Sequence, residues 1–149
     1  MAVQVRAAGL QDLDSLVPLF DGYRQFYGRE SDQALARRFL QERISRKESV
    51  VFLAEYGGQA TGFVQLYPMF TSMGAAPIWV LNDLFVAPDH RRKGVGQALL
   101  EAATQFSREN GAVKLRLSTT VTNHAAQSLY ERLGWVKEAQ YVTYELSTP

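Results

Sequence analysis

A short loop rich in glycine and basic residues is the segment of the sequence best suited to bind a ligand. It reads Arg91-Arg92-Lys93-Gly94-Val95-Gly96 and leads into a helix-forming stretch. Gly94 and Gly96 let the backbone come close to a ligand. The first turn of a helix also presents unpaired amides and the positive end of the helix dipole. The loop therefore predicts a phosphate site, and a basic turn that only begins a helix is the alternative.

Two well-known phosphate loops and a metal site do not match the sequence. A P-loop ends in Gly-Lys-Ser/Thr, whereas Gly96 is followed by Gln97-Ala98, and Leu99 stands where a dinucleotide fingerprint has its third glycine. The chain has no cysteine, and neither His90 nor His124 has another histidine at ligand spacing. We therefore expect no metal in the site.

The elements that position this loop follow from hydrophobic periodicity and turn residues. In the first half we expect a strand at 3–5, a helix at 10–27 ended by Gly28, a helix that begins at Ser31-Asp32, and antiparallel strands at 50–56 and 60–67 joined by Gly57-Gly58. In the second half we expect a loop at 68–77, a strand at 78–86, a helix at 94–110, a strand at 113–117, a helix at 123–133 and two short strands within 135–146.

This order of elements predicts an α/β fold. The strand–helix–strand step from Ile78 to Leu117 needs a crossover, which favours a parallel pair of strands. The Gly57-Gly58 hairpin is antiparallel, so the sheet should be mixed. No linker separates the elements, and 149 residues suit one core. We therefore expect a single domain over residues 1–149.

Composition excludes several other classes of protein. Hydrophobic residues make up 46% and charged residues 21%, which argues against disorder. The formal net charge of +1 is too balanced for a general binder of nucleic acid or membrane surfaces. No apolar run approaches the roughly 18 residues of a membrane span, and the first residues lack the apolar core of a signal peptide. We therefore expect a cytoplasmic protein.

Three motifs together make the loop specific. Arg91 to Gly96 resembles the Gln/Arg-x-x-Gly-x-Gly/Ala signature of the GNAT superfamily of N-acetyltransferases. Upstream, Leu81-Asn82-Asp83-Leu84-Phe85-Val86-Ala87-Pro88 resembles the fourth strand of that family. Downstream, Asn123-His124-Ala125-Ala126-Gln127-Ser128-Leu129-Tyr130 with Gly134-Trp135 resembles its Asn-x-x-Ala-x-x-Leu-Tyr helix. The resemblance covers nearly the whole chain.

The resemblance implies a fold and a way of holding acetyl-coenzyme A. The fold is a mixed, mostly antiparallel sheet flanked by helices, in which parallel central strands splay apart and the pantetheine arm lies in the gap. By position, the implied cofactor-binding residues are Leu84, Phe85 and Val86 for the pantetheine, the loop Arg91, Arg92, Lys93, Gly94, Val95, Gly96 and Gln97 for the pyrophosphate, and Asn123 and Ala126 beside the pantetheine.

The resemblance also implies the catalytic groups, although it leaves the base open. Tyr130 matches the tyrosine that commonly serves as general acid toward the leaving thiolate, and a phenol with a pKa of about 10 carries its proton near neutral pH. Relatives often have a glutamate base where Asn82 stands, and asparagine is no base. Because neighbouring strand residues point to opposite faces, either Asn82 faces the acceptor and orients it or a water, or Asp83 is a direct base. A structural role for Asp83 is the further alternative.

The acceptor is expected to be a primary amine of a small molecule, held by the first two helices and the loop before the fourth strand. These segments contain Tyr23, Phe26, Tyr27, Tyr67, Phe70 and Met73, with Asp21, Glu30 and Asp32 near in sequence. We place Tyr27 and Asn82 toward the substrate. The aromatic residues could instead be core and the acids a solvated face.

The function that these residues indicate is an acetyl-coenzyme A-dependent N-acetyltransferase acting by direct attack of the amine. A protein lysine or N-terminal acetyltransferase, and a non-catalytic sensor of acyl-coenzyme A, are the alternatives. The resemblance also implies a homodimer, because many relatives pair through their sheets or C-terminal strands. The sequence does not define which amine is the acceptor or whether acyl groups other than acetyl are transferred.

Overall fold

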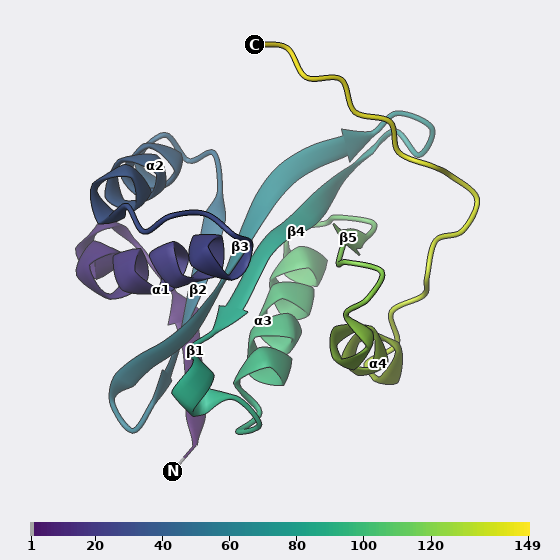
Figure 1. The fold of residues 1–149 in the computed structure, drawn as a ribbon. Helices are drawn as coiled ribbons and strands as arrows, with labels where there is room; N and C mark the ends of the chain where they lie inside the picture. Colours follow the sequence, from purple (N-terminus) through teal and green to yellow (C-terminus); the bar gives the residue numbers. More distant parts are fainter. Residues whose placement is uncertain (1) are drawn as a thin grey trace. The chain divides into compact units, whose positions relative to one another are not determined.

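The computed structural model describes residues 2–149 (Figure 1). The strands are β1 (Val3–Ala7), β2 (Val50–Tyr56), β3 (Gln59–Thr71), β4 (Ala76–Val86) and β5 (Leu115–Leu117). The helices are α1 (Leu13–Phe26), α2 (Gln33–Ser45), α3 (Val95–Glu109) and α4 (His124–Arg132), with single 3-10 turns at Leu10–Asp12 and Pro88–His90. Two compact units result, one that ends at Leu117 and one from Ser118 to Pro149.

The sheet has the order β1-β2-β3-β4-β5. The first four strands are antiparallel to their neighbours, and β5 is parallel to β4. This confirms the predicted mixed, mostly antiparallel α/β sheet. The parallel pair, which the resemblance placed at the centre, lies at one edge, because no residue after β5 adds a strand. β5 pairs with β4 only from Trp79 to Leu81, whereas β4 continues to Val86. The edge of β4 beyond Leu81 therefore carries no strand on the side away from β3.

Helices cover both faces of the sheet. In Figure 1, α1 and α2 lie on one face and α3 lies on the other. Leu16, Phe20 and Leu40 from the first two helices pack with Phe63 of the central strand β3 in the hydrophobic core. On the opposite face, the buried side chains of α3 approach Gly62, because a methyl group added at Gly62 would lie 3.1 to 3.2 Å from Val95 and Leu99.

Local chemistry sets several element boundaries as the sequence predicted. Asp32 caps α2 by accepting a hydrogen bond from the Leu35 amide at 3.0 Å. Gly57 and Gly58 make the β2–β3 turn with φ of +61° and +76°, a region that favours glycine. Asn123 caps α4 through the Ala126 amide, and Gly134 follows that helix with φ of +96°.

Three predicted segments differ in the structure. The expected loop at 68–77 is largely strand, since β3 runs to Thr71 and β4 begins at Ala76. Pro68 is tolerated because the pairing of β3 with β2 ends at Leu66, so its missing N–H removes no bond to that neighbour. The two short strands expected within 135–146 do not form, and β5 is shorter than 113–117. A strand requires a hydrogen-bonded partner, and no residue from 118 to 149 is in a strand.

Candidate active site

The N-terminus of α3 has the geometry of an anion site. Gly94 is the N-cap in the left-handed conformation, with φ of +80°, and Arg92 precedes it at +63°. The first bond within the helix runs from the Ala98 amide to the Gly94 carbonyl oxygen at 3.0 Å, so three earlier amides have no acceptor inside α3. No side chain caps this end. Its amides and dipole are therefore suited to a pyrophosphate, and the open space around Gly94 leaves room for one.

The basic side chains of the loop take different directions. Arg91 donates from Nε to the carbonyl oxygen of Val86 at 3.1 Å, and its guanidinium lies 5.7 Å from the ring centre of Phe85. Lys93 lies over the ring of Tyr56 at 5.1 Å. Arg91 thus holds the end of β4 against the loop.

The open edge of β4 contains the residues expected to meet the pantetheine arm. Leu84, Phe85 and Val86 are half-buried, and all three lie beyond the last residue that pairs with β5. Their pairing with β3 continues on the other side of the strand. An extended ligand can pair with such an edge through main-chain hydrogen bonds.

The second compact unit contains three further predicted residues, all on or beside α4. The side-chain oxygen of Asn123 accepts the Ala126 amide at 3.2 Å, so the asparagine fixes the start of the helix. The ring of Tyr130 lies 6.1 Å from that of Trp135, and the Tyr130 carbonyl oxygen accepts the Trp135 amide at 3.0 Å. These contacts fix the helix and its C-terminal end.

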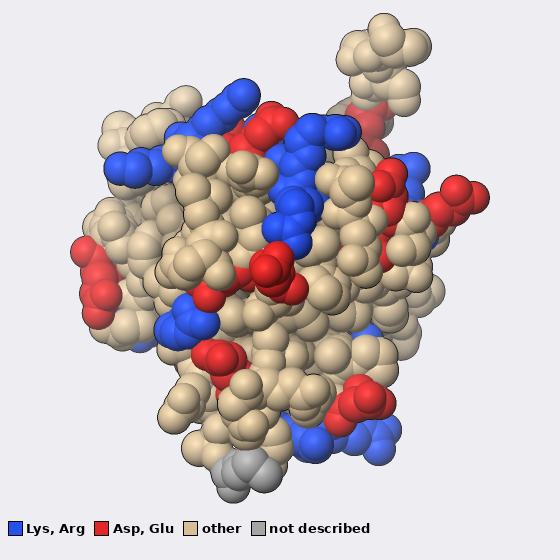
Figure 2. Space-filling view, turned by 90° about the vertical axis from the view of Figure 1, so that its left-hand side faces the viewer, with Lys and Arg blue, Asp and Glu red and all other residues tan. Residues whose placement is uncertain are grey.

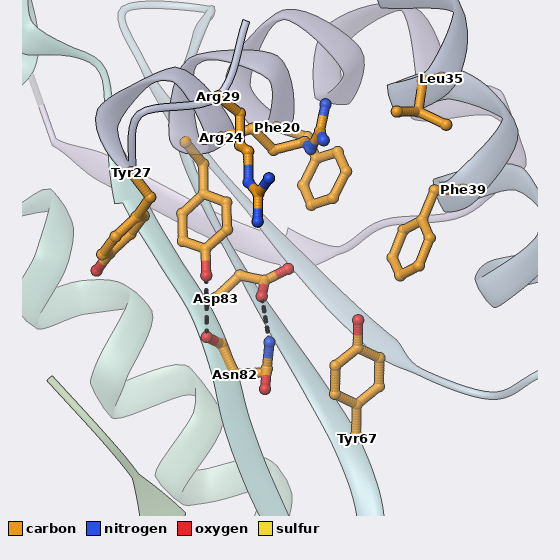
Figure 3. Close-up of a pocket in the computed structure, with 10 residues that line it drawn as sticks. Phe20, Arg24, Tyr27, Arg29, Leu35, Phe39, Tyr67, Asn82 and Asp83 are labelled. Carbon is orange, nitrogen blue, oxygen red and sulfur yellow. Dashed lines mark hydrogen bonds between the residues drawn. The ribbon is translucent and has the colours of Figure 1, made fainter. Parts of the chain in front are cut away.

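A cavity of about 400 Å³ lies between the first two helices and the sheet (Figure 3). Its lining combines aromatic and apolar side chains with a few polar groups, as small-molecule sites do. The lining residues are Phe20, Tyr23, Arg24, Tyr27 and Arg29 from α1 and the chain after it, Leu35 and Phe39 from α2, Tyr67 from β3, and Asn82 and Asp83 from β4. Tyr27 and Asn82, which the sequence placed toward the substrate, are both among them.

A β-bulge brings Asn82 and Asp83 to the same cavity. Gln65 pairs with Asp83 and Leu66 pairs with Leu81, which leaves Asn82 as the extra residue of β4. A bulge interrupts the regular alternation of side chains. The expectation that Asn82 and Asp83 point to opposite faces is therefore wrong, because it assumed an uninterrupted strand. Figure 3 shows the two side chains beside each other, joined by a hydrogen bond of 2.7 Å from Asn82 Nδ2 to Asp83 Oδ1.

Asp83 is a carboxylate in a nearly dry environment. It is only 2% exposed, accepts hydrogen bonds from the side-chain amides of Asn82 and Gln65, and forms no ion pair with a basic residue in the described chain. Burial raises the pKa of Asp83, and hydrogen bonds from Asn82, Gln65 and Tyr23 offset only part of that rise. A raised pKa moves a carboxylate toward the range useful for proton transfer near neutral pH.

Two tyrosines beside Asp83 remain protonated. Burial and the negative charge of Asp83 raise the pKa of Tyr23 and of Tyr67 well above the ordinary value of a phenol. The Tyr23 hydroxyl donates to the main-chain oxygen of Asn82 at 3.3 Å. Both hydroxyls are thus available as hydrogen-bond donors around the bulge.

Other residues named from the sequence lie outside the cavity lining. Asp21 is buried, where it accepts hydrogen bonds from Gln25, Ser31 and the Asp32 amide and so ties α1 to the start of α2. The remaining side chains of this group are exposed: Phe26, Phe70, Met73 and Glu30. The acids that were considered as attractors for a cationic amine therefore have structural or solvent-facing positions.

Five residues line the cavity although the sequence analysis did not assign them to a site: Phe20, Arg24, Arg29, Leu35 and Phe39. A signal for Arg24 existed, because it lies in the helical series 20, 23, 24 and 27 whose other members are aromatic. No comparable pattern exists for Arg29, which lies beyond the end of α1.

The basic residues of α2 are largely paired with acids. Arg37 contacts Asp14 at 2.6 Å, and Arg43 contacts Glu48 at 3.0 Å. Figure 2 shows acidic side chains among the basic ones on this side of the molecule. An exposed helical face, and not a nucleic-acid patch, is the interpretation that these pairs favour. Residues 2–149 contain no cluster of three metal-ligating side chains and no helix with the length and apolarity of a membrane span.

Comparisons with known proteins show the family of the chain. The model of the acetyltransferase (GNAT) family matches residues 16–135. An uncharacterized N-acetyltransferase of Bacillus subtilis, YhfO, is 43% identical over 147 residues, covering 99% of both chains. An aminoglycoside N(6')-acetyltransferase type 1 of Klebsiella aerogenes is 29% identical over 113 residues, covering 74% of each. The crystal structure of a probable acetyltransferase has a TM-score of 0.92 and 42% identity and covers 98% of both chains.

The fold and the family match define an acyltransferase enzyme. The chain belongs to the GNAT family, and its activity is that of an N-acetyltransferase. GNAT acetyltransferases use acetyl-coenzyme A as co-substrate.

Proposed function

We propose that the enzyme transfers an acetyl group from acetyl-coenzyme A to the primary amine of a small molecule held in the cavity between α1, α2 and the sheet. The observation that carries this proposal is Asp83. It is a buried carboxylate without a cationic partner, on the floor of a cavity and on the strand whose free edge is suited to the co-substrate. A proton acceptor and a ligand edge thus lie within three residues of each other on β4.

The residues that would hold acetyl-coenzyme A fit its chemistry. The amides from Arg92 to Gln97 would take the pyrophosphate at the α3 N-terminus. The backbone of Leu84, Phe85 and Val86 would pair with the pantetheine arm. Asn123 and Ala126 are assigned to the pantetheine by resemblance. Acetyl-coenzyme A supplies an acetyl thioester, which is activated toward amines.

Asp83 is the base in this proposal. The carboxylate accepts the proton that the attacking amine must lose, while Asn82 holds the carboxylate through its side-chain amide. The amine nitrogen forms a bond to the acetyl carbon as the carbon–sulfur bond breaks. The leaving sulfur takes a proton from the hydroxyl of Tyr130, the general acid. This route needs no water relay through Asn82, because the bulge places the carboxylate itself in the cavity.

The cavity also favours a small acceptor over a folded protein. Its volume of about 400 Å³ lies near the lower end of the usual range for small-molecule pockets. The aminoglycoside acetyltransferase relative, as its name states, acts on a small molecule with amines. We further infer that residues 1–149 act as one catalytic domain, since the family match runs across both compact units.

The test is release of free thiol from acetyl-coenzyme A across a panel of small amines and lysine peptides. At least one small amine should be acetylated, and Asp83→Asn should lower kcat for it by about 100-fold or more, the scale of general-base catalysis. Asp14→Asn, at an exposed position on α1, is the control and should keep full activity. If Asn82→Ala abolishes turnover while Asp83→Asn does not, the proton leaves through a water that Asn82 orients. Tight binding of acetyl-coenzyme A with no amine acetylated would favour a sensor.

A further inference from the structure

Two arginines line the proposed acceptor cavity. Their positive charges would repel a substrate that carries only positively charged groups. Arg24 lies on the last turns of α1, and Arg29 follows in the connection to α2; both line the cavity. The Arg29 amide donates to the Arg24 carbonyl oxygen at 3.0 Å, so the backbone holds the two residues together. Neither arginine forms a salt bridge with an acid in residues 2–149.

The Asp21 carboxylate, whose pKa Arg24 affects, already accepts hydrogen bonds from other groups. The positive charge of Arg24 contributes to the lowered pKa of Asp21, where burial acts in the opposite direction and hydrogen bonds from Ser31 and the Asp32 amide contribute more. Both carboxylate oxygens of Asp21 accept hydrogen bonds, from Gln25, Ser31 and the Asp32 amide. The guanidinium of Arg24 therefore keeps its donors for another partner.

The basic and acidic side chains of the cavity come from different elements. Figure 3 shows Arg24 and Arg29 on the helix side and Asp83 with Asn82 on the strand below. Neither arginine is among the groups that shift the pKa of Asp83, which is governed by burial and hydrogen bonds. The cavity thus has basic side chains on its helix side and a proton-accepting carboxylate on its floor.

Aromatic side chains form the walls between these two ends. The rings of Phe20 and Phe39 stack at 5.6 Å, and Tyr23 packs edge-on against Phe63 at 6.0 Å. Arg43 lies over the ring of Phe39 at 4.9 Å but is paired with Glu48, so it adds no free charge to the cavity. The walls suit an apolar or aromatic body, and the arginines suit an anion, because a guanidinium binds carboxylates and phosphates through paired donors.

We propose that the acceptor is an amine that carries an anionic group, a carboxylate or a phosphate, on the same small molecule, as an apolar or aromatic amino acid does. The anion would contact Arg24 and Arg29 while the amine faces Asp83. This inference rests on the proposed acetylation in the cavity and specifies its substrate class. A polyamine would place a second positive charge beside two arginines and is disfavoured.

Matched pairs of amines test this specificity. The pairs are phenylalanine and 2-phenylethylamine, tyrosine and tyramine, and leucine and isopentylamine, which differ only in the carboxylate; spermidine and O-phosphoethanolamine complete the set. In at least one pair, kcat/KM should be 10-fold or more higher for the amino acid. Preferred turnover of O-phosphoethanolamine would identify phosphate as the anion and would equally support the proposal.

Variants then connect the preference to the arginines. Arg24→Gln and Arg29→Gln should reduce the ratio of kcat/KM values within the preferred pair by about 10- to 100-fold, mainly through KM. Arg38→Gln, at an exposed position of α2 outside the lining, should keep the ratio. Thermal unfolding of each variant confirms that it is folded.

The outcomes separate this inference from the proposed function. Equal or better turnover of spermidine or of the amines without an anion, with Asp83→Asn inactive toward them, would reject the anionic acceptor and keep acetylation in the cavity. An unchanged ratio in both arginine variants would reject it as well. If no amine is acetylated, both proposals fail.

Discussion

The surroundings of Asp83 determine which role this residue can have. From the sequence alone, a structural role for this strand carboxylate was one of the alternatives. In the structure it is buried, faces a cavity and has no cationic partner, so its ionised form is destabilised. The side-chain amides of Asn82 and Gln65 donate hydrogen bonds to the carboxylate and offset part of that cost. A buried acid held this way is a candidate for function more than for stability.

The raised pKa of Asp83 predicts a pH-dependent gain in stability for Asp83→Asn. The folded state binds this proton more tightly than the unfolded chain, where the pKa is about 3.9. Wild-type stability therefore falls as pH rises from that value through the raised folded pKa. The replacement amide has no proton to lose, and it can donate to the Gln65 side-chain oxygen, which lacks a hydrogen-bond partner in the described chain.

Thermal unfolding between pH 4 and pH 8 measures this effect. The difference in Tm, variant minus wild type, should be smallest at the acidic end and should grow across the window. Asp14→Asn, measured in parallel, should show no such trend. A difference that shrinks as pH rises would mean that the carboxylate stabilises the fold, contrary to the burial argument.

Tyr130 is the residue whose role rests on resemblance. Tyr130→Phe removes the hydroxyl and keeps the ring that lies beside Trp135, so the helix end should remain intact. Turnover should fall by about 100-fold or more if the hydroxyl protonates the leaving sulfur. Affinity for acetyl-coenzyme A should change little. Steady-state kinetics and calorimetry on the same preparation measure both, and unchanged turnover would remove Tyr130 as the acid.

Two glycines flank helix α3, one at the proposed anion site and one at the opposite end, so substitutions at the two positions can be compared. Gly94 at its N-terminus has φ of +80°, and Gly111 beyond its C-terminus has φ of +71°; an added methyl group meets no atom within 4 Å at either position. Alanine at either position should therefore cost about the same, roughly 1 to 2 kcal/mol of left-handed strain.

Only Gly94→Ala should weaken the binding of acetyl-coenzyme A, because only that methyl group points into the space beside the helix amides. Calorimetry should show a loss of 10-fold or more in affinity for Gly94→Ala and little change for Gly111→Ala. Urea unfolding checks that both variants lose similar stability. Equal loss of affinity in the two variants would place the pyrophosphate elsewhere.

At the scale of the whole molecule, neither charge nor composition points to a large partner. The net charge is +1, and Arg37 and Arg43 of α2 pair with acids. The expected homodimer remains a prediction. Sedimentation velocity at micromolar concentration should give a single species of twice the 16.7 kDa chain mass. A species at the chain mass over the whole concentration range would contradict it.

The amino-acid sequence determined the features that local chemistry controls. Short-range hydrogen bonding and periodicity predict the glycine loop, the caps at Asp32 and Asn123, the Gly57-Gly58 turn and the order of strands and helices up to α4. The two short strands expected after α4 do not form. The family motifs added the co-substrate, since they are contiguous stretches. These features are readable because each depends on residues a few positions apart.

Only the tertiary structure decided the lining of the proposed acceptor cavity. The bulge at Asn82 depends on how β4 aligns with β3, where Gln65 and Asp83 meet from 18 positions apart. The cavity depends on α1 and α2 both packing over that bulge, which brings Arg24 and Arg29 opposite Asp83. Strand register and helix packing are set by the whole core, so no local pattern could show that two arginines and a buried carboxylate share one pocket.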